Sequence, residues 1–213
     1  MARARGVDII GPMSVQAATA DEQLMRAYAG GDATAFETLY DRHAARVWRY
    51  ILRSTRDAAT ADDLAQEVWF SVARQAGQYA PRASAPGLPL ARFTTWLFTI
   101  ARHRVVDHLR ATRPQASLDA PAGDDAGQTL ADTLAAPSGF GPVRRIETRQ
   151  QAAQLLAALD ALPPEQREAF LLQAEADMSV ADIASTTGVP FETARSRLRY
   201  ARAALRRTLE TMA

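Results

Sequence analysis

The 213-residue chain contains no cysteine and no long apolar run. Without thiolates it forms neither disulfides nor cysteine-based zinc sites, so zinc fingers are excluded. No run approaches the roughly 20 apolar residues that a membrane-spanning helix requires. Both absences agree with a protein of the reducing cytoplasm, which is the location that we expect, without membrane insertion.

Enzymatic motifs are missing as well. Gly30-Gly31 is not followed by Lys-Ser or Lys-Thr, and the H-E-x-x-H pattern does not occur. His103 and Asp107 would share a helix face, which raises the hypothesis of a metal-dependent hydrolase. His108, however, points about 100° away from Asp107, and no second cluster completes a coordination shell. We therefore expect no enzymatic activity, no catalytic residue, no metal and no cofactor.

Aromatic residues make up only 7% of the chain, whereas alanine is abundant. Alanine has the highest helix propensity, and aromatic residues favour strands, so the composition favours helices. Apolar residues also recur at three- and four-residue steps through most of the chain. The sequence therefore predicts an all-α fold.

The segment 179–202, SVADIASTTGVPFETARSRLRYAR, has the pattern of two short helices around a tight turn. Ser179 and Asp182 form an S-x-x-D capping box, which predicts the start of the first helix. Gly188 supplies a left-handed exit from that helix, and Pro190 suits the first position of the next. This is the pattern of a helix-turn-helix, whose second helix enters a major groove.

The second of these helices is basic. Between 179 and 210 there are six arginines and three acidic residues, a net charge of +3 within a chain whose formal charge is only +1. Phosphate contacts would use such an excess. The alternative is an ordinary helical hairpin with a solvated basic face.

An acidic group opens a helix in the first half of the chain, ADDLAQEVWFSVARQA. Thr60 and Asp63 have capping-box spacing, and we expect them to start the helix. The group off the apolar stripe consists of Asp62, Asp63, Gln66 and Glu67. Two interpretations remain open, because acidic residues in a first turn compensate the helix dipole but also suit a partner surface.

A loop followed by an amphipathic helix comes next. The segment 77–89, GQYAPRASAPGLP, is too rich in proline and glycine to continue a helix. The helix expected over 90–110 carries Phe93 and Thr94 at its start, with Arg92, Arg102, His103, Arg104, His108 and Arg110 on its outer faces. Aromatic and basic groups beside a loop suit unpaired nucleic acid, since bases stack on rings. The alternative is an aromatic core with a solvated basic rim.

The composition changes most sharply at 114–143, which holds four aspartates, four prolines and no Lys or Arg. This predicts a flexible linker between a helical domain at 21–113 and a second one at 144–213. Residues 1–20 are predicted to be a disordered tail, because their apolar piece is too short for a secretory signal. Met13 is a candidate start of the natural protein.

The helical spacings also predict the core. Asp21 is expected to cap a helix that stops at Gly30-Gly31, and Pro164 to begin another. The expected core residues of the first domain are Leu24, Tyr28, Phe36, Leu39, Tyr40, Val47, Tyr50, Ile51, Leu64, Val68, Val72, Trp96, Leu97, Ile100, Ala101, Val105 and Leu109. Those of the second are Leu155, Leu156, Leu159, Ala169, Phe170, Leu172, Ala194, Leu198, Ala201 and Leu205.

Five stretches together resemble bacterial RNA polymerase sigma factors of the extracytoplasmic-function group. In the first half these are AFETLYDRHAARVWRY, DDLAQEVWFSVAR and FTTWLFTIARHRVVDHLR. In the second they are LDALPPEQREAFLL and SVADIASTTGVPFETARSRLRYARAALRR. The resemblance implies a region 2 helical bundle and a region 4 helix-turn-helix. It also implies a protein that directs core polymerase to promoters and helps to melt the −10 element.

The resemblance implies roles for individual residues. Asp63, Gln66 and Glu67 would bind core polymerase. The loop at 77–89 would capture a flipped base of the −10 element, and Phe93, Thr94, Arg102, His103, Arg104 and Arg110 would contact that element. Thr193, Arg195, Ser196 and Arg199 would read the −35 element. The expected partners are core polymerase, promoter DNA and an anti-sigma factor, and the expected state is a monomer.

The chain departs from the family pattern in two places. Many relatives carry Asn where this chain has His103, and their loop before FTTWLF is often shorter. The base preference at −10 is therefore not transferred. The alternative function is a stand-alone helix-turn-helix regulator that binds a palindromic duplex as a dimer.

Overall fold

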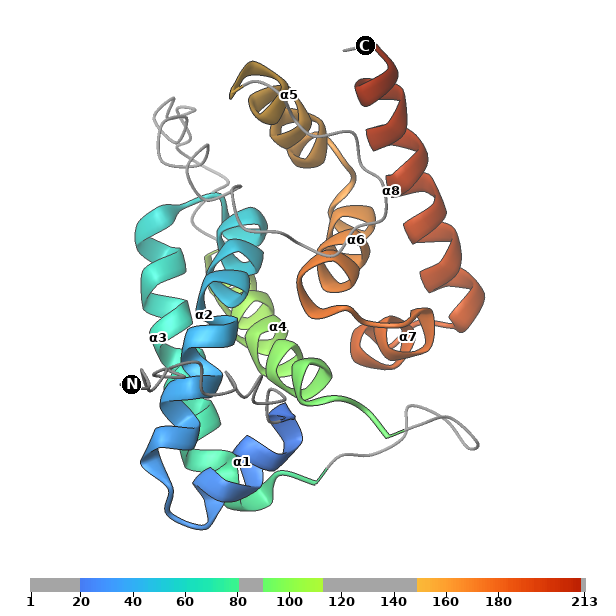
Figure 1. Ribbon diagram of the computed structural model, residues 1–213. Coiled ribbons are helices and arrows are strands. Elements are labelled where there is room, and N and C mark those ends of the chain that lie inside the picture. The colour runs from blue at the N-terminus through green and yellow to red at the C-terminus, as the bar shows by residue number, and fades with distance from the viewer. Residues whose placement is uncertain (1–19, 81–89, 113–148, 212–213) are drawn as a thin grey trace, which may run out of the picture.

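The computed structural model describes residues 20–80, 90–112 and 149–211. Within these ranges the chain forms eight α-helices and one 3-10 helix, in two groups of four α-helices (Figure 1). The first group is α1 (Asp21–Ala29), α2 (Ala33–Thr55), α3 (Ala58–Gln75), η1 (Ala76–Gln78) and α4 (Phe93–Thr112). The second is α5 (Arg149–Asp160), α6 (Pro164–Ala176), α7 (Val180–Thr187) and α8 (Phe191–Thr211). The all-α fold predicted from composition is confirmed.

In the first domain α2 packs against α1, α3 and α4. Most of the core predicted for this domain is buried, and Tyr50 meets Phe98 edge to face with ring centroids 5.5 Å apart. Two predictions were wrong. Tyr40 is 45% exposed because it lies outside the core, against one side of Trp69. Leu109 is 40% exposed because α4 has no buried residue after Val105.

In the second domain α8 packs against α5, α6 and α7. The predicted stripe of Ala194, Leu198, Ala201 and Leu205 is buried along its whole length. Leu172, Met178 and Ile183 complete the core beneath it. Pro164 is the first residue of α6, as expected, since proline fits where a helix needs no amide donor.

The helix starts differ from two of the predicted caps. Helix α3 begins one turn earlier than its capping-box spacing indicates, because the carboxylate of Asp57 accepts from the backbone N–H of Thr60 at 2.6 Å. Asp21 is the first residue of α1 and not its cap. Its carboxylate is bound to α2 instead, and Asp32 provides the cap of that helix.

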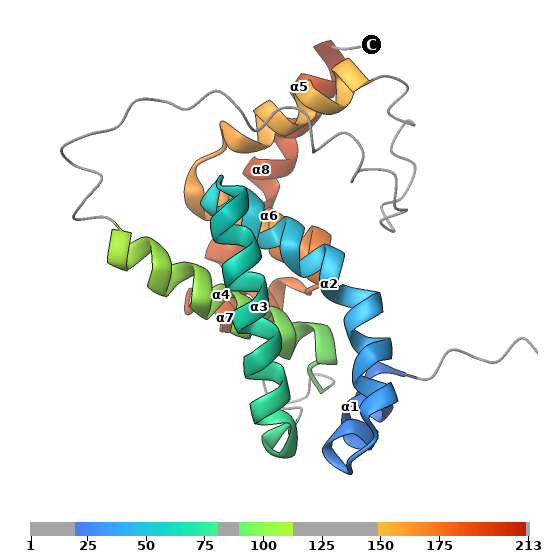
Figure 2. The same cartoon turned by 90° about the vertical axis from the view of Figure 1, so that its left-hand side faces the viewer.

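The two domains pack against each other through α6, which contacts both α2 and α4. Seen from the side, α6 lies close behind α2 (Figure 2). The buried apolar residues of both domains form one continuous cluster. Packing between the domains is not visible in the sequence pattern, and it determines which polar side chains remain accessible.

Three predicted features lie outside the described residues. These are the tail at 1–20 except Ala20, the linker at 114–143 and most of the loop at 77–89, of which the structure describes 77–80. None of the helices that the structure describes combines the length and the apolar character needed to span a bilayer.

Candidate nucleic-acid interface

The helix-turn-helix has the local geometry that its sequence predicts. The Oγ of Ser179 accepts from the backbone N–H of Asp182 at 3.1 Å, and the Asp182 carboxylate accepts in return from the N–H of Ser179 at 3.1 Å. Gly188 ends α7 in the left-handed region with φ 70°, where a side chain would be strained. Pro190 directly precedes α8 rather than being its first residue, and its carbonyl accepts from Thr193 and Ala194.

Two of the four predicted −35 residues are exposed on helix α8. Arg195 and Arg199 are exposed, and the Arg199 guanidinium lies 4.9 Å from the centroid of the Tyr200 ring. Ser196 is half-buried, and its Oγ donates to the carbonyl of Thr193 at 2.9 Å. The exposed arginines are therefore the residues of this set best placed to reach bases.

The six predicted −10 residues are placed in three different environments. Phe93 and Thr94 are buried, with Phe93 fully so. A direct contact of Phe93 with DNA would require its ring to leave the core. Arg102 and Arg104 are half-buried and hold other side chains, whereas His103 and Arg110 are exposed.

Arg102 and Arg104 are both bound within the protein. The Nε of Arg102 donates to Glu168 of α6 at 2.9 Å. Arg104 donates to the Oγ of Ser71 at 3.0 Å and lies 3.8 Å from Glu67, both on α3. The first contact joins the two domains, whereas the second lies within the first domain.

Three aromatic rings hold the two ends of the 81–89 segment together. Tyr79 precedes the segment and Phe93 follows it, and their ring centroids lie 6.0 Å apart. Trp96 packs on both rings, at 5.1 Å from Tyr79 and 5.9 Å from Phe93. Burial raises the pKa of Tyr79 to about 12, so the phenol stays neutral. Tyr79 and Phe93 thus lie close together on either side of the 81–89 segment, in the loop region predicted to capture a flipped nucleotide base.

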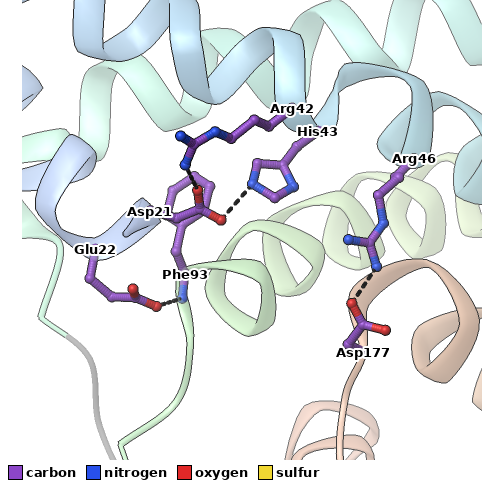
Figure 3. Close-up of polar contacts among 7 residues, drawn as sticks. All are labelled: Asp21, Glu22, Arg42, His43, Arg46, Phe93 and Asp177. Carbon is purple, nitrogen blue, oxygen red and sulfur yellow. Dashed lines mark hydrogen bonds and ion pairs between the residues drawn. The ribbon is translucent and has the colours of Figure 1, made fainter. Parts of the chain in front are cut away.

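Helix α1 binds both the start of α4 and the side of α2 (Figure 3). The Glu22 carboxylate accepts from the backbone N–H of Phe93 at 2.9 Å, at the start of α4. Asp21 binds α2 through Arg42 and through Nε2 of the buried His43, each at 2.7 Å. Burial raises the pKa of Asp21, but hydrogen bonds from His43 and Arg42 outweigh it and hold that pKa below its ordinary value of 3.8.

A polar hollow of about 340 Å³ opens beside these residues. Three arginines line it, Arg42, Arg46 and Arg92, together with Asp21 and Asp177. Arg46 belongs to the first domain and Asp177 to the second, and their side chains form an ion pair at 2.8 Å (Figure 3). Glu22 lines the hollow as well, so three arginines face three carboxylates and the formal charges of the lining balance.

The contact between the domains is a row of such pairs, which we call the interdomain clasp. Besides Arg46–Asp177 and Arg102–Glu168, Arg49 binds Glu175 through two hydrogen bonds of 3.1 and 2.8 Å. Arg53 lies 3.4 Å from Asp160, whose backbone carbonyl accepts from Arg56. All the arginines come from the first domain and all the acceptors from the second.

The three residues predicted to bind polymerase lie together on one face of α3. Asp63, Gln66 and Glu67 are exposed, and Phe70 continues the same face with 57% of its surface exposed. Asp62 is exposed too, but its carboxylate accepts from the indole N–H of Trp48 at 2.7 Å. The face is acidic and has an exposed aromatic ring at one end, as a docking surface for a basic partner would.

Sequence reasoning missed the residues that support this site. Asp21, Glu22, His43 and Arg46 act across elements, so no local spacing points to their partners. The one available signal was a histidine at a core position of α2, between apolar Leu39 and Val47. Concerning the metal hypothesis for His103 and Asp107, the described part of the chain holds no group of three His, Asp or Glu side chains arranged for a metal.

Two family models match the chain, Sigma-70 region 2 at residues 39–115 and Sigma-70, region 4 at residues 152–205. Among curated proteins, RNA polymerase sigma factor CarQ of Myxococcus xanthus is 35% identical over 81% of this chain and 88% of its own. The ECF RNA polymerase sigma factor SigL of Mycobacterium tuberculosis is 35% identical over 86% of this chain and 94% of its own.

Two solved structures share the fold. One is CnrH in complex with the cytosolic domain of CnrY, with a TM-score of 0.56 and 21% identity over 92% of this chain and 100% of that one. The other is the sigma factor RpoE in complex with the anti-sigma factor NepR from Bartonella quintana, with a TM-score of 0.57 and 21% identity over 82% of this chain and 96% of that one.

Proposed function

Because the chain belongs to the extracytoplasmic-function group of RNA polymerase sigma factors, we propose that its two domains read the two elements of a promoter while bound to core polymerase. Membership of this group gives the general function, which is to direct core polymerase to promoters at transcription initiation. Members of this family are initiation factors rather than enzymes.

The first domain, which we assign to 21–113, carries the polymerase-docking face of Asp63, Gln66 and Glu67. The Asp63 and Glu67 carboxylates and the Gln66 amide are exposed on one face of α3 beside Phe70, a grouping that dipole compensation alone would not require. Their charge fits a basic partner surface. The same domain contacts the −10 element through Arg102, His103, Arg104 and Arg110.

A nucleotide base extruded from the −10 element enters the hollow, which lies near the start of α4 after the 81–89 segment. Of the arginines that line this hollow, Arg42 and Arg46 are each bound to an aspartate, and the exposed Arg92 is the one best placed to hold a phosphate beside the base. Phe93 and Thr94, buried beneath, keep the hollow in place instead of contacting the base themselves.

The second domain, which we assign to 144–213, reads the −35 element in the major groove. Arg195 and Arg199 reach base edges or phosphates, and Thr193 and Ser196 contribute near the helix start. The linker at 114–143 tethers the two domains, so that each gains effective concentration once the other is bound.

Promoter binding requires the clasp to open. Glu168 occupies Arg102, and Asp177 occupies Arg46 at the hollow, so both arginines reach DNA only after the domains separate. Most side chains of these ion pairs are largely buried, so binding to polymerase would have to supply the free energy that separates them. We expect an anti-sigma factor to bind the free chain in the cytoplasm. Of the structural relatives, RpoE is bound to the anti-sigma factor NepR, and CnrH is bound to the cytosolic domain of CnrY.

The observation that carries the proposal is that one chain has two different binding surfaces, a helix suited to the major groove and an acidic face suited to docking. A stand-alone regulator needs only the first. The two functions differ in DNA binding by the purified chain alone. A sigma factor shifts promoter DNA strongly only when core polymerase is added, whereas a dimeric regulator shifts a duplex without it. A strong shift by the chain alone, unchanged by polymerase, would favour the regulator.

A further inference from the structure

Phe191 is an aromatic residue at the exposed start of the groove-reading helix. It is the first residue of α8 and 49% of its surface is exposed. The preceding turn is defined by the left-handed backbone of Gly188 and by the Pro190 carbonyl, which accepts from Thr193 at 3.0 Å and Ala194 at 3.1 Å. The ring is therefore held at the end of the helix and does not depend on a mobile neighbour for its position.

The ring lies on the same stripe of the helix as two exposed arginines. At 100° per residue, Arg195 is about 40° and Arg202 about 20° from Phe191 around the axis. The buried stripe of Ala194 and Leu198 lies to the other side. Phe191 thus borders the exposed basic face of α8, and a surface that approaches Arg195 also approaches the ring.

The structure gives this ring no partner of its own kind. Among the other exposed rings, Tyr40 packs on Trp69 and Tyr200 contacts the Arg199 guanidinium, whereas Phe70 on the α3 face resembles Phe191 in having no ring contact in the part of the chain that the structure describes. Among the described residues no aromatic ring contacts Phe191. Leaving half of a phenyl ring in water forgoes part of the roughly 1.5–3 kcal/mol that full burial of such a side chain contributes, so a bound partner would benefit from covering it.

The groups exposed in the major groove indicate what Phe191 would contact. Residues at the start of a groove-reading helix are those that contact base edges. The only large apolar group that base edges present in the major groove is the C5 methyl of thymine, and phenylalanine is among the side chains that contact it. We propose that Phe191 reads a thymine of the −35 element through this methyl group, next to the arginine contacts.

The proposal rests on the proposed function and adds a residue to it. It also gives neighbouring side chains on this stripe two different kinds of DNA contact. Arg195 supplies charge for phosphates or guanine, whereas Phe191 supplies an apolar contact that discriminates thymine from cytosine at the same edge. Because the methyl contact carries no charge, its contribution should not fall with salt, unlike the arginine contacts.

The test uses the full chain with core polymerase on a promoter that this holoenzyme selects from a randomised library. Each thymine of the −35 element is replaced in turn by deoxyuridine, which removes the methyl group and nothing else. For the unaltered chain we expect one such replacement to weaken promoter binding by about fourfold, the effect of one methyl group. For Phe191→Ala we expect that same replacement to have no effect.

Phe191→Leu provides a check, because an aliphatic side chain keeps an apolar contact and should retain part of the thymine preference. Two outcomes would overturn the proposal. Either no deoxyuridine affects the unaltered chain, or Phe191→Ala keeps the full penalty. Weakened binding of Phe191→Ala to core polymerase without DNA would also reject it, in favour of a protein contact. If no promoter is selected at all, it is the proposed function that fails.

Discussion

The guanidinium of Arg102 donates to the carboxylate of Glu168 at 2.9 Å, and this bond joins a predicted −10 contact on α4 to α6 of the second domain. Each of the two side chains is more than three-quarters buried by the contact and its surroundings. The pair therefore holds a predicted DNA-binding residue within the protein itself. We expect loss of the pair to change the affinity for DNA more than the free energy of unfolding.

Replacing Glu168 by Gln should release Arg102. We expect the free chain to bind single-stranded −10 DNA more tightly, by up to about fivefold, since one partly exposed ion pair contributes about 1 kcal/mol or less. Fluorescence anisotropy with labelled DNA measures this. Glu165→Gln, on an exposed position of the same helix, is the matched control. Equal affinities for Glu168→Gln, Glu165→Gln and the unaltered chain would show that the pair does not restrict Arg102.

A disulfide offers a second test of the clasp. The hydroxyl oxygens of Thr99 on α4 and Thr186 on α7 lie 3.5 Å apart, and the chain has no cysteine of its own. In Thr99→Cys with Thr186→Cys, the two sulfur atoms should bond on oxidation, because the side chains are within bridging range. We expect the oxidised protein to lose promoter-dependent transcription and a reductant to restore it.

Each single cysteine variant controls for the substitutions themselves, since it cannot form the bridge. Full transcription by the oxidised double variant would show that the domains need not separate. Failure to form the bridge in the free protein would show that the closed arrangement is not maintained in solution.

The acidic face of α3 predicts a charge-dependent affinity for core polymerase. Replacing Asp63 by Asn and Glu67 by Gln together should weaken core binding about tenfold, if each carboxylate contributes a surface ion pair. A competition assay against a labelled sigma factor measures this affinity. Glu37→Gln with Asp41→Asn removes two exposed carboxylates from α2 at the same four-residue spacing and should have no effect. Equal affinities for both double variants would remove the docking assignment.

Asp21 should stabilise the first domain in a pH-dependent way. Because its pKa is lowered in the folded state, its contribution is present above the ordinary value of 3.8 and is lost as the pH falls through the folded-state pKa. We expect Asp21→Asn to cost about 1–2 kcal/mol at neutral pH, since two charge-assisted hydrogen bonds to a half-buried group are lost. Urea unfolding of both proteins between pH 7 and the acid limit checks this, and a difference that does not narrow in acid would contradict it.

The sequence predicted the features that depend on local spacing. The helix-turn-helix followed from Ser179, Asp182 and Gly188, and its buried stripe from Ala194 and Leu198, because caps and helical periods involve residues at most a few positions apart. The predicted cap of α3 was one turn too late for a related reason. Asp57 and Thr60 both have acceptable spacing, and which of them caps depends on where the preceding helix ends.

The contacts between elements were beyond this reasoning. Arg102 and Glu168 are 66 positions apart, and the segment between them includes the whole of 114–143. Spacing indicated only that Arg102 lies off the buried stripe of α4, which suits DNA, solvent or an acidic neighbour equally. Phe93 was placed at the start of its helix correctly, but its burial depends on Tyr79 and His43, which come from other elements, as well as on Trp96 of its own helix.

The central claim is that this chain directs core polymerase to specific promoters. Run-off transcription with purified core polymerase on a genomic fragment library tests it most directly, because it reports both initiation and the promoter sequences chosen. We expect discrete transcripts that depend on the chain and share −10 and −35 elements at a fixed spacing. Transcripts that are the same with and without the chain would contradict it.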